Sequence, residues 1–189
     1  MAELTRLAGA LAQVTQLLNQ LQVPYMVIGG VANLVWGNPR TTQDVDITVS
    51  IPDTNLDQVI EVLGRNLRVL PSDPRTFLDE THVLPLAALG GVRIDLIHAW
   101  LPFEEAAIAR AQAIILGGVP VRIATAEDLI VHKLASKRPR DAEDATGVLR
   151  RQRTSLDRAY LDPLVRSLSE ALDEPGIWET YQQEIEPGY

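Results

Sequence analysis

Two aspartates, Asp44 and Asp46, are separated by one residue within a run at residues 44–49 in which polar and apolar residues alternate. That alternation is the period of a β-strand. Because alternate residues of a strand point to the same face, the two carboxylates are expected to project side by side. Two carboxylates this close disfavour each other's ionisation unless a cation lies between them. Since Mg²⁺ is commonly held by one or two carboxylates together with substrate phosphates, the pair predicts a magnesium site for a phosphate-bearing substrate.

A glycine pair, Gly29-Gly30, precedes the aspartates, with the thirteen residues 31–43 between them. The pair follows an apolar strand predicted at residues 25–28 and leads into a short helix predicted at residues 31–36. Glycine at such a turn lets backbone N–H groups approach a phosphate closely, and the helix adds the positive end of its dipole. Gly29 and Gly30 are therefore candidate ligands of a nucleotide triphosphate.

A third carboxylate, Asp95, lies within an otherwise apolar strand predicted at residues 92–97. A lone buried charge would be costly there. Brought beside Asp44 and Asp46, it would complete a two-metal site that stabilises the attacking and leaving oxygens of an in-line displacement, or it would take the proton from the attacking hydroxyl. The alternative interpretation is structural: Asp44 caps a turn, and Asp46 and Asp95 are surface residues of edge strands.

The elements that must position these residues follow from apolar periodicity and turn signals. Helices are predicted at residues 3–21, 31–36, 54–65 (capped by Asp53 or Thr54) and 102–111. Strands are predicted at residues 25–28, 44–49, 67–70, 81–89, 92–97, 113–116 and 119–123. Thr125 starts a helix in capping-box fashion, and further helices are predicted at residues 140–151 and, interrupted at Pro175-Gly176, at 155–184. We therefore expect an α+β fold, with a core at residues 1–124 and a helical C-terminal region at residues 125–189 packed on it.

Composition is that of an ordinary globular protein, with 46% hydrophobic and 22% charged residues in a chain of 189. There is no cysteine, which excludes disulfides, thiolate metal sites and cysteine nucleophiles. Neither a signal peptide nor a stretch of ~20 apolar residues is apparent. We expect a soluble cytoplasmic protein with no membrane partner.

Charge is distributed unevenly along the chain. The net charge of −8 argues against broad, non-specific adhesion to nucleic acid. Residues 132–153 nevertheless hold seven basic and three acidic side chains, for a local charge of +4, and residues 155–189 hold eight acidic and two basic ones, for −6. The seven basic residues are Lys133, Lys137, Arg138, Arg140, Arg150, Arg151 and Arg153. A local basic surface is able to hold a polyanion although the whole protein is acidic.

The glycine pair, the Asp44–Asp46 pair and Asp95 in a later strand resemble the signature of the nucleotidyltransferase superfamily, whose fold is the palm of DNA polymerase beta. More narrowly, residues 29–46 resemble the AbiEii-type toxins of bacterial toxin–antitoxin and phage-abortive systems, and are similar to lincosamide-type antibiotic nucleotidyltransferases. Residues 124–144 match the second conserved block of that group. The resemblance spans about residues 25–150. It implies a nucleotidyltransferase-like mixed β-sheet flanked by helices.

The same resemblance implies transfer of a nucleoside monophosphate from an NTP, such as ATP, with release of pyrophosphate and dependence on Mg²⁺. It makes Asp44, Asp46, Asp95 and Lys133 catalytic residues, with the three aspartates also as metal ligands, and lines the triphosphate with Gly29 and Gly30. Lys133 would lie near the nucleotide phosphates, with Asp144, or alternatively Asp141, completing its motif. Arg40, between the glycine pair and the aspartates, is placed to contact the triphosphate through two nitrogens. Glycine at position 30 replaces the small hydroxyl residue usual in the group, which removes one phosphate contact.

Three functional hypotheses follow. In the leading one the acceptor is RNA, above all tRNA, and the enzyme is the toxin of a pair with an antitoxin protein; the +4 segment at residues 132–153 supports it. The second keeps the chemistry but moves the nucleotide to a small molecule, such as an antibiotic hydroxyl, or to a protein side chain, which the net charge of −8 supports. The third is a non-catalytic nucleotide-binding or partner-binding module, against which the intact aspartate pair argues. The leucine-rich N-terminal helix leaves the oligomeric state open.

Overall fold

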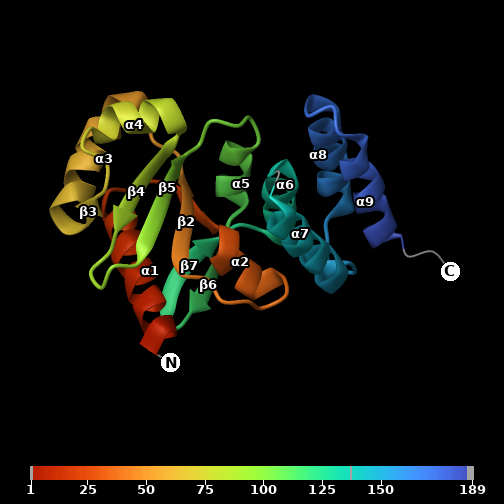
Figure 1. Cartoon of the computed structure of the whole chain (residues 1–189), viewed down its shortest axis with the longest axis horizontal. Helices are drawn as coiled ribbons and strands as arrows, with labels where there is room; N and C mark the ends of the chain where they lie inside the picture. Colours follow the sequence, from red (N-terminus) through yellow and green to blue (C-terminus); the bar gives the residue numbers. More distant parts are fainter. Residues whose placement is uncertain (1, 137, 187–189) are drawn as a thin grey trace. The chain divides into compact units, whose positions relative to one another are not determined.

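A computed structural model describes residues 2–136 and 138–186 of the chain (Figure 1). Contacts between Cα atoms divide these residues into two compact units. The first, which we call the core unit, comprises residues 2–31 and 41–124; the second, the helical unit, comprises residues 32–40 and 125–186 without residue 137. Lys137 and residues 187–189 of the predicted C-terminal region lie outside the described residues. The division into domains at residues 1–124 and 125–189 stays a prediction.

The core unit is built on a seven-stranded sheet in the order β3-β4-β5-β2-β1-β7-β6, as far as the described residues show. Its strands are β1 (Tyr25–Ile28), β2 (Asp44–Val49), β3 (Arg68–Val69), β4 (Val83–Ala87), β5 (Arg93–His98), β6 (Gln112–Leu116) and β7 (Val119–Ile123). Strand β2 pairs antiparallel with β1 and parallel with β5, so the sheet is mixed, as predicted. Because β2 and β5 both lie inside the sheet, the alternative interpretation of their aspartates as edge-strand residues is wrong.

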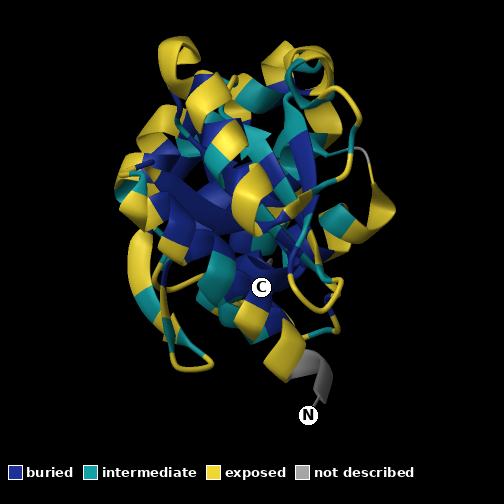
Figure 2. Cartoon of the chain, turned by 90° about the vertical axis from the view of Figure 1, so that its left-hand side faces the viewer, coloured by how far each residue is buried: buried dark blue, intermediate teal, exposed yellow. Residues whose placement is uncertain are grey.

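Helices cover the sheet and supply its core contacts. In the core unit these are α1 (Ala2–Gln20), α3 (Asp53–Asn66), α4 (Pro74–Thr81), α5 (Glu104–Arg110) and the first turn of α2 (Gly29–Trp36). The odd-numbered residues of β2 are fully buried, whereas Asp44 and Asp46 are only partly buried. Helix α5 packs on Met26 and Ile28 of β1. Figure 2 shows the buried strands in dark blue and the exposed turns of the helices in yellow. Burying each large aliphatic side chain contributes about 1.5–3 kcal/mol, which fixes the strands that carry the aspartates.

Helix α4 was not expected from the sequence, and the predicted strand at residues 81–89 is shorter than predicted, as β4. The physical reason is local. Asp73 accepts a hydrogen bond from the backbone N–H of Thr76 at 3.1 Å, and Pro74 occupies the first turn, where its missing N–H costs nothing. His82, at φ 58°, then ends the helix in the left-handed conformation, and the strand begins only after it.

Helix α3 also differs from expectation at its start. Its N-cap is Pro52, without a side-chain cap, so the predicted capping by Asp53 or Thr54 is wrong. The helix is stabilised instead by its buried face, which includes Leu56 and Leu63. Packing of an amphipathic face outweighs a missing cap, which typically costs about 1 kcal/mol.

The helical unit contains α6 (Ala126–Ala135), α7 (Pro139–Gln152), α8 (Arg158–Ala171) and α9 (Pro175–Ile185), together with the later turns of α2. Helix α6 contacts α7 and α8, and α9 contacts α7 and α8. The predicted cap of α6 is confirmed: Thr125 Oγ1 accepts a hydrogen bond from the backbone N–H of Asp128 at 3.2 Å. The predicted interruption at Pro175-Gly176 is confirmed as well, because α9 begins at Pro175. No helix among the described residues has both the length and the hydropathy needed to cross a membrane.

Candidate active site

Three carboxylates share one face of the central strands of the core unit. Asp46 of β2 is paired directly with Asp95 of β5, and Asp44 lies two residues before Asp46 on the same strand. Directly paired residues of parallel strands, and residues two apart on one strand, point to the same side of a sheet. The structure therefore brings Asp44, Asp46 and Asp95 onto one face.

Gly29 lies on the other side of β2 from Asp95. Ile28, the last residue of β1, pairs with Asp46, so Gly29 follows directly beside that aspartate. Its φ of +63° favours glycine, and a Cβ atom there would lie 2.7 Å from Cγ of Asp46 and closer still to Oδ2. Any other residue at position 29 would displace the carboxylate. The glycine was predicted for its approach to phosphate; the structure adds that it makes room for Asp46.

Gly30 makes room for a hydroxyl group. A Cβ atom at Gly30 would lie 2.8 Å from the Cβ of Thr42 and closer to Thr42 Oγ1. Thr42 is 8% exposed, and its Oγ1 donates a hydrogen bond to Oδ1 of Asp44 at 3.0 Å. The hydroxyl missing at position 30 is evident from the sequence, whereas Thr42 is not among the predicted site residues. The structure puts a hydroxyl group from another segment into the space left by that glycine.

Arg93 is a site residue that sequence reasoning missed. It is the first residue of β5, where it pairs with Asp44. Its Nε atom lies 2.9 and 3.1 Å from the two carboxylate oxygens of Asp95, and its Nη2 atom lies 2.9 Å from Oδ1. The pKa of Arg93 is raised, chiefly by this hydrogen bond and the charge of Asp95, with smaller effects from Asp44 and Asp46. A signal was present, because Arg93 and Asp95 are two residues apart on one strand and so share a face.

The donor set suits a hard cation such as Mg²⁺, which prefers carboxylate oxygens. The absence of a Cβ atom at Gly29 fits the same purpose, because it leaves the space in which the carboxylate of Asp46 lies. However, no three acidic or histidine side chains in the described part of the chain are arranged as ligands of one ion. Asp95 is engaged by Arg93, and Oδ1 of Asp44 accepts from Thr42. The residues fit a metal site, with Asp95 held in a salt bridge.

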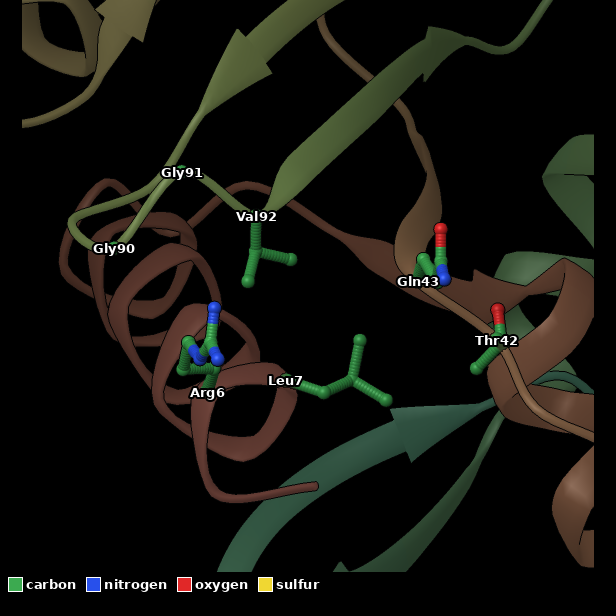
Figure 3. A pocket seen from close by; sticks show the side chains of 7 residues that line it. All are labelled: Arg6, Leu7, Thr42, Gln43, Gly90, Gly91 and Val92. Atoms are coloured by element: carbon green, nitrogen blue, oxygen red, sulfur yellow. The ribbon is translucent and has the colours of Figure 1, made fainter. Parts of the chain in front are cut away.

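A pocket of about 300 Å³ adjoins this region of the core unit (Figure 3). Arg6 and Leu7 of α1 form one wall, and Thr42 with Gln43 and the loop at residues 90–92 form the others. None of the three carboxylates lines it. Thr42 therefore belongs to both the pocket and the carboxylate site: it lines the pocket, and its hydroxyl group donates a hydrogen bond to Asp44.

A second group of predicted site residues meets within the helical unit. Asp144 of α7 is 7% exposed and accepts from Arg40, at 3.0 Å for Nε–Oδ1 and 2.8 Å for Nη2–Oδ2. Lys133 Nζ lies 3.0 Å from Oδ2 of Asp144 and also donates to Asp141. Asn33 Nδ2 contacts Asp144 Oδ1 at 3.3 Å. The sequence left Asp141 and Asp144 as alternatives, and the structure joins both to Lys133.

These ion pairs control the protonation of both carboxylates. Burial acts to raise the pKa of Asp144, but hydrogen bonds from Arg40 and Lys133 outweigh it, so the pKa is lowered from its ordinary value of 3.8. For Asp141 burial also acts to raise the pKa, and hydrogen bonds from Lys133 and Ser136 outweigh it. Both groups are therefore anionic at neutral pH, and the cluster is an ion-paired network with two cations and two anions.

Solved structures share this arrangement of helices and strands. The crystal structure of ANT(2")-Ia in complex with adenylyl-2"-tobramycin matches with a TM-score of 0.58 and 18% identity, covering 91% of this chain and 99% of that one. An antigenic nucleotidyltransferase-like protein from Paracoccidioides brasiliensis matches with a TM-score of 0.52 and 16% identity, covering 94% and 93%. The solution structure of ANT(2'')-Ia gives a TM-score of 0.55 and 20% identity, covering 91% and 97%. The fold is that of the nucleotidyltransferases.

The sequence matches the family described as "Nucleotidyltransferase of unknown function (DUF6036)" over residues 2–172, and the chain belongs to that family. Membership confirms the predicted superfamily and the predicted enzyme class. A comparison with curated proteins finds no match.

Proposed function

We propose that this nucleotidyltransferase moves a nucleoside monophosphate from an NTP to an acceptor hydroxyl, with Mg²⁺ bound at Asp44 and Asp46 and with Asp95 as the third ligand. The observation that carries the proposal is the register of β2 and β5, which sets Asp46 beside Asp95 on the face that also bears Asp44. Divalent cations bound there would neutralise the triphosphate and stabilise the attacking and leaving oxygens.

Residues of the chain supply the proton acceptor and the phosphate-binding groups that the transfer also requires. The acceptor oxygen attacks the α-phosphorus, the bond from that phosphorus to the bridging oxygen breaks, and pyrophosphate leaves. Asp95 is the carboxylate proposed to take the acceptor's proton. Gly29 and Gly30, at the start of the eight-residue helix α2, present backbone N–H groups and the positive end of the helix dipole to the triphosphate.

For the helical unit, the prediction remains that Lys133, Arg40 and Asp144 take part in nucleotide binding. Lys133 and Arg40 both bind Asp144. A phosphate oxygen accepts hydrogen bonds from lysine and arginine as a carboxylate does. Contact of either cation with the triphosphate therefore requires that it exchange a carboxylate partner for a phosphate.

We place a small hydroxyl-bearing molecule first among acceptors, and RNA, with its toxin–antitoxin role and antitoxin partner, second. The RNA hypothesis depends on the basic segment at residues 132–153. Within it Lys133 is bound to Asp141 and Asp144, and Arg150 binds Glu184 through Nε at 2.6 Å and Nη2 at 2.7 Å. These pairs reduce the charge offered to a phosphate backbone, and the whole chain carries −8. The adenylyl-2"-tobramycin bound to ANT(2")-Ia supports a small acceptor on this fold.

The proposal is tested with each α-³²P-labelled NTP and Mg²⁺, offered in parallel to aminoglycoside and lincosamide antibiotics, to total bacterial tRNA and to cell extract. We expect labelled small molecule with the wild type and at least about a hundredfold less with Asp46→Asn. Asp79→Asn is the matched control, because Asp79 is an exposed acid of the core unit that pairs with Arg75 in α4.

Each outcome assigns the acceptor differently. Label in tRNA alone would reverse the order of the two acceptors and support the toxin hypothesis. Label in a protein of the extract would identify a protein acceptor. Absence of nucleotide binding in both the wild type and the Asp46→Asn variant would leave the non-catalytic, partner-binding hypothesis in place of the enzyme.

A further inference from the structure

The salt bridge between Arg93 and Asp95 occupies the carboxylate that the proposed function assigns to a metal ion. Both oxygens of Asp95 lie within 3.1 Å of Arg93 Nε, and Oδ1 is also 2.9 Å from Nη2. The guanidinium takes up part of the lone-pair capacity of the carboxylate and neutralises the negative charge that would attract a metal ion. Arg93 and a metal ion are therefore competitors for Asp95.

The guanidinium also offsets the repulsion among the three carboxylates of the site. Asp44, Asp46 and Asp95 lie on one face of two adjacent strands, where their negative charges repel one another. Arg93 lies on that face, where it is paired with Asp44 across the strands and bound to Asp95 through a salt bridge. It supplies positive charge in the region where a metal ion would supply it.

Arg93 is also the more exposed member of the pair. Its side chain is 56% exposed, whereas that of Asp95 is 20% exposed. A long, half-exposed arginine side chain can rotate into solvent while its charge remains hydrated, and an exposed ion pair contributes little to stability. Asp95 is fixed by its place in an interior strand, so the arginine is the member of the pair that moves.

We propose that Arg93 is a displaceable counter-ion: it neutralises Asp95 and must release that carboxylate before Asp95 ligates a divalent cation. This inference rests on the proposed function. It gives a physical reason why no three-carboxylate ligand set is formed among the described residues although the strand register brings three carboxylates to one face. Affinity for the metal then includes the cost of opening the Arg93–Asp95 pair.

The test is the binding of Mn²⁺, without nucleotide, measured by electron paramagnetic resonance of free Mn²⁺ and by calorimetry. We expect Arg93→Gln to bind Mn²⁺ roughly three- to tenfold more tightly than the wild type, since the competing cation is gone. Arg93→Lys, which keeps a charge but loses the two-nitrogen contact, should lie between them. Thermal melting of each variant shows that it is folded.

Two controls separate competition at Asp95 from a general change in charge. Arg75→Gln removes the same charge from the core unit, but Arg75 pairs with Asp79 and Asp57 and not with the site. An equal gain in Arg75→Gln would overturn the proposal. In the Asp95→Asn background, Arg93→Gln should bring no gain, because the pair that it opens is already absent; a full gain there would also overturn it.

The inference and the proposed function fail in different ways. If Mn²⁺ binds with dependence on Asp46 but equally to the wild type and Arg93→Gln, the site stands and the counter-ion role is wrong. If Mn²⁺ binds neither protein, or binds both without dependence on Asp44 and Asp46, the metal site of the proposed function is wrong, and the role of Arg93 falls with it.

Discussion

The hydroxyl group of Thr42 donates a hydrogen bond to Oδ1 of Asp44 at 3.0 Å, from a position that a side chain at residue 30 would fill. The bond fixes one oxygen of the carboxylate and leaves Oδ2 for other ligands. Groups that orient a metal-binding carboxylate in this way affect metal affinity and rate although they do not touch the metal. The orientation of Asp44 therefore depends on glycine at position 30 and threonine at position 42 together.

Replacing Thr42 by valine should lower kcat/KM and metal affinity by about tenfold, because Asp44 loses its orienting bond while the volume stays the same. Thr42→Ser retains the hydroxyl and should stay within about threefold of the wild type. Steady-state kinetics and Mn²⁺ titration measure the two effects. Equal behaviour of the valine variant and the wild type would show that the bond has no role in the site.

Replacing Gly29 by alanine should destabilise the core unit by about 3 kcal/mol or more and abolish metal binding. The left-handed φ costs about 1–2 kcal/mol, and the new Cβ meets Asp46 at 2.7 Å or less. Gly90→Ala is the matched control, because Gly90 has φ +94° but nothing within 4 Å of a built Cβ. Urea denaturation gives both free energies of unfolding. Equal losses in the two variants would mean that the contact with Asp46 costs nothing.

Replacing Asp144 by asparagine should destabilise the helical unit by about 2–4 kcal/mol at pH 7, since Arg40 and Lys133 lose their shared anion. This difference in the free energy of unfolding between the two proteins should become smaller at acid pH. The pKa of Asp144 is below 3.8 in the folded protein, so the unfolded chain binds the proton first, and the stabilisation disappears as pH falls below about 4. Urea midpoints of both proteins between pH 7 and pH 3 test this. A difference that does not depend on pH would contradict the ion-pair explanation.

His132 predicts a second, separate pH window. Burial, and then the charge of Lys133, lower its pKa from 6.5 to about 4 in the folded protein. The unfolded chain therefore binds the proton between these values, and the free energy of unfolding should fall by about 2–3 kcal/mol as pH drops from 6.5 to 4. His132→Gln should remove most of this slope, which stability curves in urea at half-unit pH steps will show. An unchanged slope would place the acid sensitivity elsewhere.

Much of the site could be predicted because its parts are local in sequence. The alternation at residues 44–49 predicted β2 with the correct bounds, and the strand predicted at residues 92–97 is present as β5 with bounds one residue later. The helical interruption at Pro175-Gly176 was equally local. Helix α4 was not predicted because its residues show no clear apolar period. Leu78 is its one buried apolar residue, so the capping residue Asp73 was not followed by a helical pattern.

Other relationships have no local sequence signal. Arg40 was predicted to contact the triphosphate, and the structure shows it bound to Asp144, 104 residues away. Thr42 was not predicted as a site residue, because its place beside Asp44 depends on the space left by the missing side chain at Gly30. Asp95 was treated as a lone carboxylate in need of a partner; its partner, Arg93, was two residues away, but only the register shows that Asp44 lies opposite that arginine.

The sequence by itself determined which residues are able to do chemistry, since residue type and the periods of strand and helix are written in neighbouring positions. It thereby determined the enzyme class, the aspartate pair and the glycine turn. Only the tertiary structure decided which charges meet: Asp46 with Asp95, Arg93 with Asp95, and Arg40 and Lys133 with Asp144. The reason is physical, because pairing between strands and helices distant in sequence is fixed by burial and packing of the whole unit, which no local period encodes.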